Sequence, residues 1–145
     1  MSINTVLGWF EAAVPNPTPA NQCIQLGVHY EEVGEMAEAI GDTNTAEELA
    51  SISAFYKHCA ADEQNANLAL ANIDHAALLD SLCDQIVTAT GVAYMMGYDI
   101  RGALAEVDRS NWSKFVDGKP VFNAQGKIAK GPNYTPPDLT KFLNR

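Results

Sequence analysis

The apolar residues of this chain recur every three or four positions as far as about residue 108, and there the pattern stops. This spacing places them on one face of successive amphipathic helices. Beyond residue 108, Gly and Pro turn signals replace the periodicity. We therefore predict an all-α protein, an antiparallel bundle of four to five helices with an irregular C-terminal arm. Residues 1–109 form the helical body, and residues 110–145 form the arm of the same single domain.

A proline-rich segment separates the first two predicted helices. Three prolines within residues 15–19 end a helix over about 3–13, because proline lacks a backbone donor and clashes with the preceding turn. A second helix covers about 20–40. Gly41 then suits the left-handed residue that commonly ends a helix.

Thr45 and Glu48 fit a capping box, in which each side chain accepts a hydrogen bond from a free backbone donor. They predict the start of a third helix that runs to about residue 61. Its predicted buried side consists of Ile52, Phe55, Tyr56 and Cys59. Cys23 and Cys83 also lie in apolar-periodic stretches, and we interpret all three cysteines as small buried hydrophobes, with free-thiol chemistry as the alternative.

The remaining elements follow from further capping and turn signals. Residues 62–73 are compatible with a loop or with more helix. Asp74 is the predicted N-cap of a long helix through residue 96, and Asp99 caps a short helix to about residue 107. Within the arm, a small hairpin could form over residues 120–129.

Charge is distributed unevenly along the chain. The net charge of −9 argues against a nucleic-acid polymer or an anionic membrane as partner. Residues 1–108 carry a balance of −14, whereas residues 109–145 carry +5. No run reaches the roughly 18 apolar residues of a membrane span, and the first residues lack the pattern of a signal peptide. We therefore expect a cytoplasmic protein, in the host cytoplasm if a phage encodes it.

Four glutamates share one side of the second predicted helix. At 100° per residue, Glu31, Glu35 and Glu38 fall within about 60° of one another, and Glu32 lies about 60° from Glu35. No Lys or Arg precedes Lys57 in the sequence to relieve their repulsion. An external cation would provide that relief. The alternative is an ordinary acidic face exposed to solvent.

A second pair of acids lies on the long helix that Asp74 caps. Asp80 and Asp84 are one turn apart on a helix that is otherwise apolar, where unpaired carboxylates are costly. Carboxylates from two helices suit a hard divalent ion such as Mg²⁺ or Mn²⁺, which takes oxygen ligands. The alternative is a helix edge that reaches solvent.

The arm collects side chains that suit phosphate oxygens. Bases, amides and hydroxyls near turns supply donors and positive charge. The candidates for phosphate binding are Arg109, Asn111, Lys114, Lys130 and Tyr134. Because the chain lacks a P-loop motif, this is not a P-loop nucleotide site. The alternative is a basic arm that only packs against an acidic body.

Three motifs occur together in this chain. They are Glu31-Glu32-x-x-Glu35, then Leu79-Asp80-Ser81-Leu82, and finally Glu106-Val107-Asp108-Arg109-Ser110-Asn111-Trp112-Ser113-Lys114 followed by Lys130-Gly131-Pro132-Asn133-Tyr134-x-Pro136-Pro137-Asp138-Leu139. From about Gln22 onward, the chain resembles the all-α nucleoside triphosphate pyrophosphohydrolases, the superfamily of MazG, dimeric dUTPases and phosphoribosyl-ATP pyrophosphohydrolase. It is most similar to phage MazG-like proteins, including the MazZ type, which implies dGTP or GTP as substrate.

The resemblance implies a set of metal ligands. The first family pair falls on Glu32 and Glu35. The second family motif, Glu-x-x-Asp, falls on Ala77 and Asp80, so one ligand is missing from its usual place. The available substitutes are Glu38 and Asp84.

The resemblance also implies a reaction. Two or three Mg²⁺ or Mn²⁺ ions would bridge the triphosphate and lower the pKa of a water. Attack at the α-phosphorus would release pyrophosphate and leave a nucleoside monophosphate. The predicted catalytic residues are Glu31, Glu35 and Glu38, with Glu31 or Glu38 as the proton acceptor. Lys and Asn side chains of the arm would neutralise charge on the leaving pyrophosphate.

A slot for the base could involve Trp9 and Phe10, although core packing explains these two residues equally well. The candidates for reading the edge of the base are Asn16, Asn21 and Gln25. The resemblance implies a homodimer or homotetramer. Alternative functions are hydrolysis of dUTP, dCTP, a modified nucleotide or phosphoribosyl-ATP, and non-catalytic nucleotide binding by a regulator. A structural domain with an acidic interaction face is a further alternative.

Overall fold

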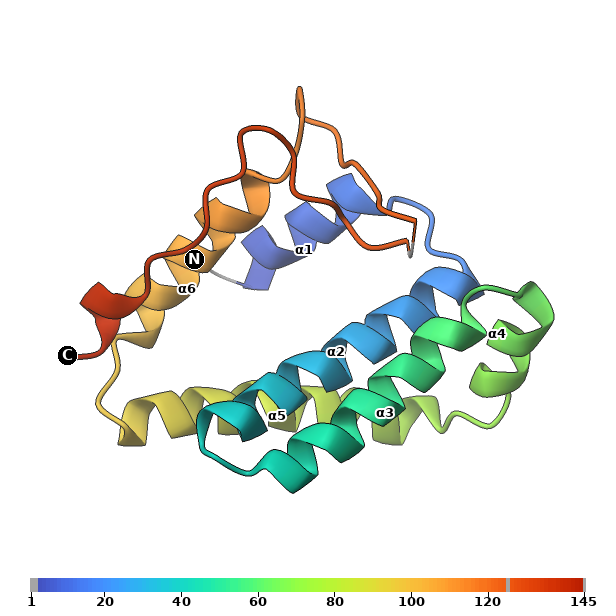
Figure 1. Cartoon of the computed structure of the whole chain (residues 1–145), viewed down its shortest axis with the longest axis horizontal. Helices are drawn as coiled ribbons and strands as arrows, with labels where there is room; N and C mark the ends of the chain where they lie inside the picture. Colours follow the sequence, from blue (N-terminus) through green and yellow to red (C-terminus); the bar gives the residue numbers. More distant parts are fainter. Residues whose placement is uncertain (1–2, 125, 145) are drawn as a thin grey trace. The chain divides into compact units, whose positions relative to one another are not determined.

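The computed structural model describes residues 3–124 and 126–144, and within these residues it contains helices and turns but no strand. Figure 1 shows helices connected by short loops and followed by an extended C-terminal segment. The α-helices are α1 (Ile3–Ala13), α2 (Pro19–Ala39), α3 (Thr43–Cys59), α4 (Glu63–Leu70), α5 (His75–Met95) and α6 (Ile100–Trp112), and a 3₁₀ helix, η1, covers Thr140–Phe142. The prediction of an all-α protein with a C-terminal arm is confirmed.

The chain forms two compact units. The α2–α3–α4 unit contains residues 16–73 together with residues 123–127 of the arm. The α1–α5–α6 unit contains α1, the chain from residue 74 to 122, and the arm from residue 128 onward. Each unit is described by itself below.

Small residues line the contact between α2 and α3. A Cβ added to Gly27 would lie 2.8 Å from the backbone oxygen of Ser53 and 2.8 Å from Cγ of Lys57. One added to Gly34 would lie 3.4 Å from Cβ of Leu49. The buried residues of the two helices are Cys23, Gly27, Gly34 and Ala37 on α2, and Ala46, Ser53 and Cys59 on α3. The two backbones therefore approach closely, and the rings of Tyr30 and Tyr56 stack between the two helices with centroids 5.7 Å apart.

The start and the buried face of α3 differ from the prediction. Asp42 is its N-cap and accepts hydrogen bonds from the backbone N–H and the hydroxyl of Thr45, so the predicted capping box at Thr45 is wrong. Cys59 is buried and Tyr56 half-buried, as predicted, but Ile52 and Phe55 are exposed. The reason is that α2 approaches α3 closely, so the contact has room for the small Ser53 but not for the bulky Ile52 and Phe55.

The other boundaries follow local capping. Asp62 caps α4, so part of the segment 62–73, for which both loop and helix were expected, is a short helix. Asp74 and Asp99 are N-caps as predicted. The helix α6 is longer than predicted, because it continues to Trp112 with Ser113 as its C-cap, and so the first residues assigned to the arm are helical.

Two of the three cysteines are buried as predicted. Cys23 and Cys59 lie with Ala66 in the core of the α2–α3–α4 unit. Cys83 is exposed, and its predicted burial is wrong. It lies on α5, where none of the described side chains is buried.

An aromatic cluster joins α1 to the end of α6. The Trp9 ring stacks on Phe115 with centroids 5.8 Å apart, and it meets Phe10 edge-on at 5.0 Å. Trp112 packs against Phe115 at 5.2 Å, and Phe115 itself is buried. Aromatic contacts of this kind make α1 part of the α1–α5–α6 unit.

The arm lies along α6 and is fixed to it by hydrogen bonds. The Ser110 hydroxyl donates to the carbonyl oxygen of Thr135 at 2.9 Å, and the backbone N–H of Asp99 donates to that of Phe142 at 2.8 Å. The predicted pairing within residues 120–129 is present in a short form, as an isolated antiparallel bridge between Phe122 and Ile128 with a hydrogen bond from the Ala129 N–H to the Val121 carbonyl oxygen at 2.6 Å. The turn-rich sequence supports single bridges but not continuous strands.

The helix α5 exposes large apolar side chains along its whole length. They are Leu79, Ile86, Val87, Val92, Tyr94 and Met95. No charged residue occurs between Asp84 and Asp99, and so the C-terminal half of this face is uncharged. Among the described residues, no helix combines the length and the apolar character that a membrane crossing requires.

Candidate functional site

The acidic run of α2 presents three exposed carboxylates. Glu32, Glu35 and Glu38 lie within two turns of this helix and are exposed. They offer the hard oxygen donors that Mg²⁺ and Mn²⁺ prefer. Asp80 and Asp84 are also exposed, on α5 in the other unit. Within the described ranges, no group of three or more His, Cys, Asp or Glu side chains is already arranged as a metal site.

Glu31 differs from its acidic neighbours because two lysines hold it. Nζ of Lys57 lies 2.9 Å from one carboxylate oxygen, and Nζ of Lys127 lies 2.6 Å from the other. Burial raises the pKa of Glu31, but the hydrogen bonds and positive charges of Lys127 and Lys57 outweigh it, so the pKa is lowered. A carboxylate that is ionised and bonded at both oxygens is a poor proton acceptor.

The helical spacing of charges does not reveal these two bases. It predicts no Lys or Arg that relieves the repulsion among the four glutamates, and for Glu31 that prediction is wrong. Lys57 comes from the last turn of α3, and Lys127 comes from the arm. Neither is a helical neighbour of Glu31, so the i+4 rule could not find them.

Arg109, a predicted phosphate ligand on α6, is engaged by Glu106 of the same helix and by the arm. Its Nε and Nη2 donate to the two carboxylate oxygens of Glu106 at 2.9 and 2.8 Å. Its other bonds run to the Thr135 hydroxyl and the Pro136 carbonyl oxygen. The Arg109 hydrogen bond and the backbone N–H of Asp138 lower the pKa of Glu106 to about 2. These contacts make Arg109 an anchor for the arm.

The other four predicted phosphate ligands lie where residues 130–135 pass the end of α6. Nζ of Lys114 donates to Oδ1 of Asn111 at 2.8 Å. Nζ of Lys130 lies 4.9 Å from the centre of the Tyr134 ring. The two segments are in contact, because a Cβ on Gly131 would lie 2.9 Å from the Lys114 carbonyl oxygen. We call this group of Asn111, Lys114, Lys130 and Tyr134 the donor corner.

The predicted base-binding residues belong to both units. Trp9 and Phe10 pack in the aromatic cluster, and this packing accounts for both rings. In the part of the chain that the structure describes, the buried indole N–H of Trp9 has no acceptor. Asn21 is engaged at the start of α2, where its Oδ1 accepts from the N–H and the hydroxyl of Thr18. Asn16 and Gln25 are exposed on the α2–α3–α4 unit.

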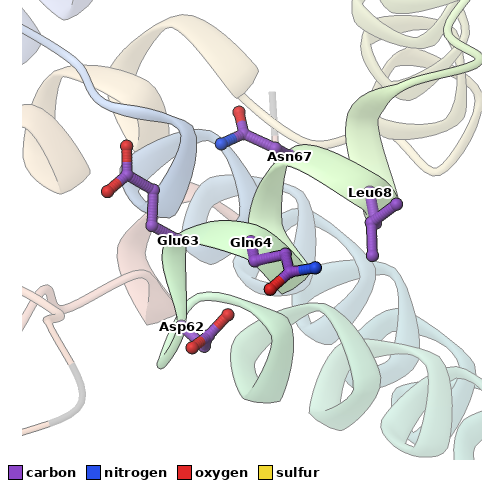
Figure 2. Close-up of a pocket in the computed structure, with 5 residues that line it drawn as sticks. All are labelled: Asp62, Glu63, Gln64, Asn67 and Leu68. Atoms are coloured by element: carbon purple, nitrogen blue, oxygen red, sulfur yellow. The ribbon is translucent and has the colours of Figure 1, made fainter.

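A shallow hollow of about 570 Å³ lies beside α4. Figure 2 shows that the side chains that line it come from one short segment, α4 and its N-cap. They are Asp62, Glu63, Gln64, Asn67 and Leu68. Asp62 already accepts a hydrogen bond as the N-cap of α4. The hollow contains none of the residues that the sequence singled out.

Comparisons of this chain with protein-family models, with curated proteins and with solved structures found no match. Membership of the MazG-like superfamily therefore stays a prediction from the sequence motifs.

Proposed function

We propose that this protein is a metal-dependent nucleotide pyrophosphohydrolase. It would cleave a nucleoside or deoxynucleoside triphosphate, with dGTP or GTP as the best candidate, to a monophosphate and pyrophosphate. The observation that carries the proposal is the donor corner, in which the Asn111–Lys114 pair at the end of α6 lies next to the arm segment that carries Lys130 and Tyr134. Such donors suit the oxygens of a polyphosphate. A small nucleotide of this kind also agrees with a cytoplasmic location.

The exposed carboxylates of the chain suit a divalent metal by their chemistry. Glu32, Glu35 and Glu38 of α2 would bind Mg²⁺ or Mn²⁺, and Asp80 and Asp84 of α5 are further candidate ligands, for two or three ions in all. All are oxygen donors, as these ions require, and Ala77 cannot replace any of them. When bound, such ions supply positive charge to phosphate oxygens and lower the pKa of a water.

The chain's own residues would then orient the substrate and accept a proton. With Glu31 engaged by two lysines, Glu38 is the better candidate for the proton acceptor, with Glu35 as a metal ligand. Lys114 and Lys130 would offset the negative charge that develops on the leaving pyrophosphate.

The direct test is incubation with each dNTP in the presence of Mg²⁺ or Mn²⁺, followed by separation of the products. We expect a monophosphate and pyrophosphate, and Glu35→Gln should abolish turnover. Glu47→Gln, an exposed glutamate on α3, serves as the control and should keep it. Release of a diphosphate, or no turnover with either metal, would contradict the proposal.

A second candidate is a nucleotide-binding regulator without turnover. Ala77 favours it, because alanine has no side-chain oxygen to bind a metal at the position where the family has a glutamate ligand. It would bind a dNTP with metal but release no pyrophosphate. We also propose a homodimer or homotetramer, on the grounds of the exposed apolar face of α5.

A further inference from the structure

Glu31 binds two ammonium groups, one at each carboxylate oxygen. Lys57 and Lys127 each bond a different oxygen of the Glu31 carboxylate, at 2.9 and 2.6 Å. The three side chains are 21%, 34% and 35% exposed for Lys57, Lys127 and Glu31. The group therefore keeps one positive charge in excess and stays open to solvent on one side.

The positions of both lysines are built into the backbone. The stem of Lys57 crosses α2 at Gly27, where any larger residue would collide with its Cγ. Lys127 ends a tight turn in which its own backbone N–H donates to Oδ1 of Asn123 at 3.0 Å. The turn also uses Gly126 at a φ of +76°, a conformation that favours glycine. The ion pair alone therefore does not determine where these two lysines lie.

Two ammonium donors on separate oxygens are the arrangement that binds an oxyanion. A phosphate group presents the same paired oxygens as a carboxylate but carries more negative charge. We propose that Lys57 and Lys127 bind a terminal phosphate group, and that Glu31 is the internal counter-ion that holds them in place when no ligand is bound. We call this the Glu31 site.

The ligand class rests on the proposed function, which requires a place for the pyrophosphate end of the substrate. Glu31 is followed directly by Glu32, the first of the proposed metal ligands. Lysines at this point would therefore contact phosphate oxygens beside the metal. All three residues of the Glu31 site belong to the α2–α3–α4 unit.

The test is binding of inorganic pyrophosphate to the whole chain without metal, measured by isothermal titration calorimetry at low salt. Lys57→Met and Lys127→Met keep the apolar stem and remove the charge, and each should weaken binding about tenfold. Lys119→Met, which changes an exposed arm lysine, is the matched control and should bind like the unmodified chain. Circular dichroism of every variant separates lost binding from lost folding.

Glu31→Gln gives the sharper result. It removes the competing negative charge, and so pyrophosphate should bind several times more tightly. Three results would each overturn the proposal. They are weaker pyrophosphate binding by Glu31→Gln, binding by both lysine variants as tight as that of the unmodified chain, and no saturable binding to the unmodified chain. Lys127 lies outside the helices, so its variant keeps the test valid even if Lys57→Met fails to fold.

This experiment is independent of turnover. Pyrophosphate binding that depends on both lysines, in a protein that hydrolyses no dNTP, would support the Glu31 site and reject the proposed function. Turnover with unchanged binding in the lysine variants would do the opposite.

Discussion

Gly27 shows how a single residue sets the distance between two helices. A methyl group at this position would lie 2.8 Å from the Ser53 carbonyl oxygen, which the helical backbone cannot move cheaply. Gly27→Ala should therefore destabilise the protein by about 1–3 kcal/mol. Urea unfolding followed by circular dichroism measures this.

The control is Gly8→Ala in the middle of α1, where a Cβ meets no atom of its own unit within 4 Å. Alanine favours helix over glycine by about 1 kcal/mol, so this variant should be neutral or slightly stabilised. Equal destabilisation by both substitutions would mean that the close approach at Gly27 has no special cost.

Glu106 should make the attachment of the arm sensitive to acid. Its pKa in the folded protein, about 2, lies below the ordinary value of 4.5 because of Arg109 and the Asp138 N–H. A lowered pKa stabilises the fold above the ordinary value, and this stabilisation is lost as pH falls from 4.5 through about 2. Thermal unfolding of Glu106→Gln should therefore depend less on pH across this window than unfolding of the unmodified chain.

The matched control is Glu47→Gln on α3, which should keep the acid sensitivity of the unmodified chain. Parallel pH curves for all three proteins would contradict the role of Glu106. Hydrogen exchange at the Asp138 amide, which donates to Glu106 at 3.1 Å, gives a local readout of the same event.

At the residue scale, the sequence predicted what neighbours in the chain determine. Asp74 and Asp99 cap their helices because a short acidic side chain reaches the backbone N–H groups two or three residues on. The bond from Lys127 to Glu31 spans 96 positions, and no local pattern encodes it. The sequence therefore predicted a carboxylate at position 31, but it could not predict that lysines bind this carboxylate in the folded chain.

At the scale of elements, periodicity located the helices better than it located their buried faces. The spacing predicted a bulky face on α3 with Ile52 and Phe55 inside, yet the α2 contact uses Ala46, Ser53 and Cys59. Small residues carry little hydrophobic signal, although they permit the closest backbone approach. The helix α5 is largely apolar, as predicted, but none of its described side chains is buried.

We expect the exposed face of α5 to be the contact between copies of this chain. Val87 is 68% exposed in an uncharged part of the helix, and burying such a face against its equivalent removes apolar area from water. Val87→Glu would place two like charges in that contact and should shift the protein toward the monomer. Size-exclusion chromatography with light scattering measures the shift.

Leu68→Glu is the matched control, because Leu68 is 65% exposed but lies on α4 in the other unit. It should leave the oligomeric state of the unmodified chain unchanged. A monomeric unmodified chain, or the same shift with both variants, would contradict a contact through α5.

At the scale of the whole molecule, the opposed charges of body and arm serve two purposes. Part of the arm's positive charge is neutralised within the fold, by Arg109 on Glu106 and by Lys127 on Glu31. Glu32, Glu35 and Glu38, with Asp80 and Asp84, are exposed to solvent. The charge asymmetry therefore contributes to folding as well as to the proposed binding of metal.

The proposed function requires carboxylates of α2 and of α5 to bind divalent ions, and Mn²⁺ affinity tests this. Glu35→Gln and Asp80→Asn should each weaken Mn²⁺ binding measured by calorimetry. If both side chains bind one cluster of ions, the Mn²⁺ affinity of the double variant should be only slightly below that of the single variant with the lower affinity. The reason is that the first substitution already disrupts the cluster. Losses of binding free energy that add in the double variant would mean two independent sites. The control is Asp62→Asn, which changes only the cap of α4 and should leave Mn²⁺ affinity unchanged.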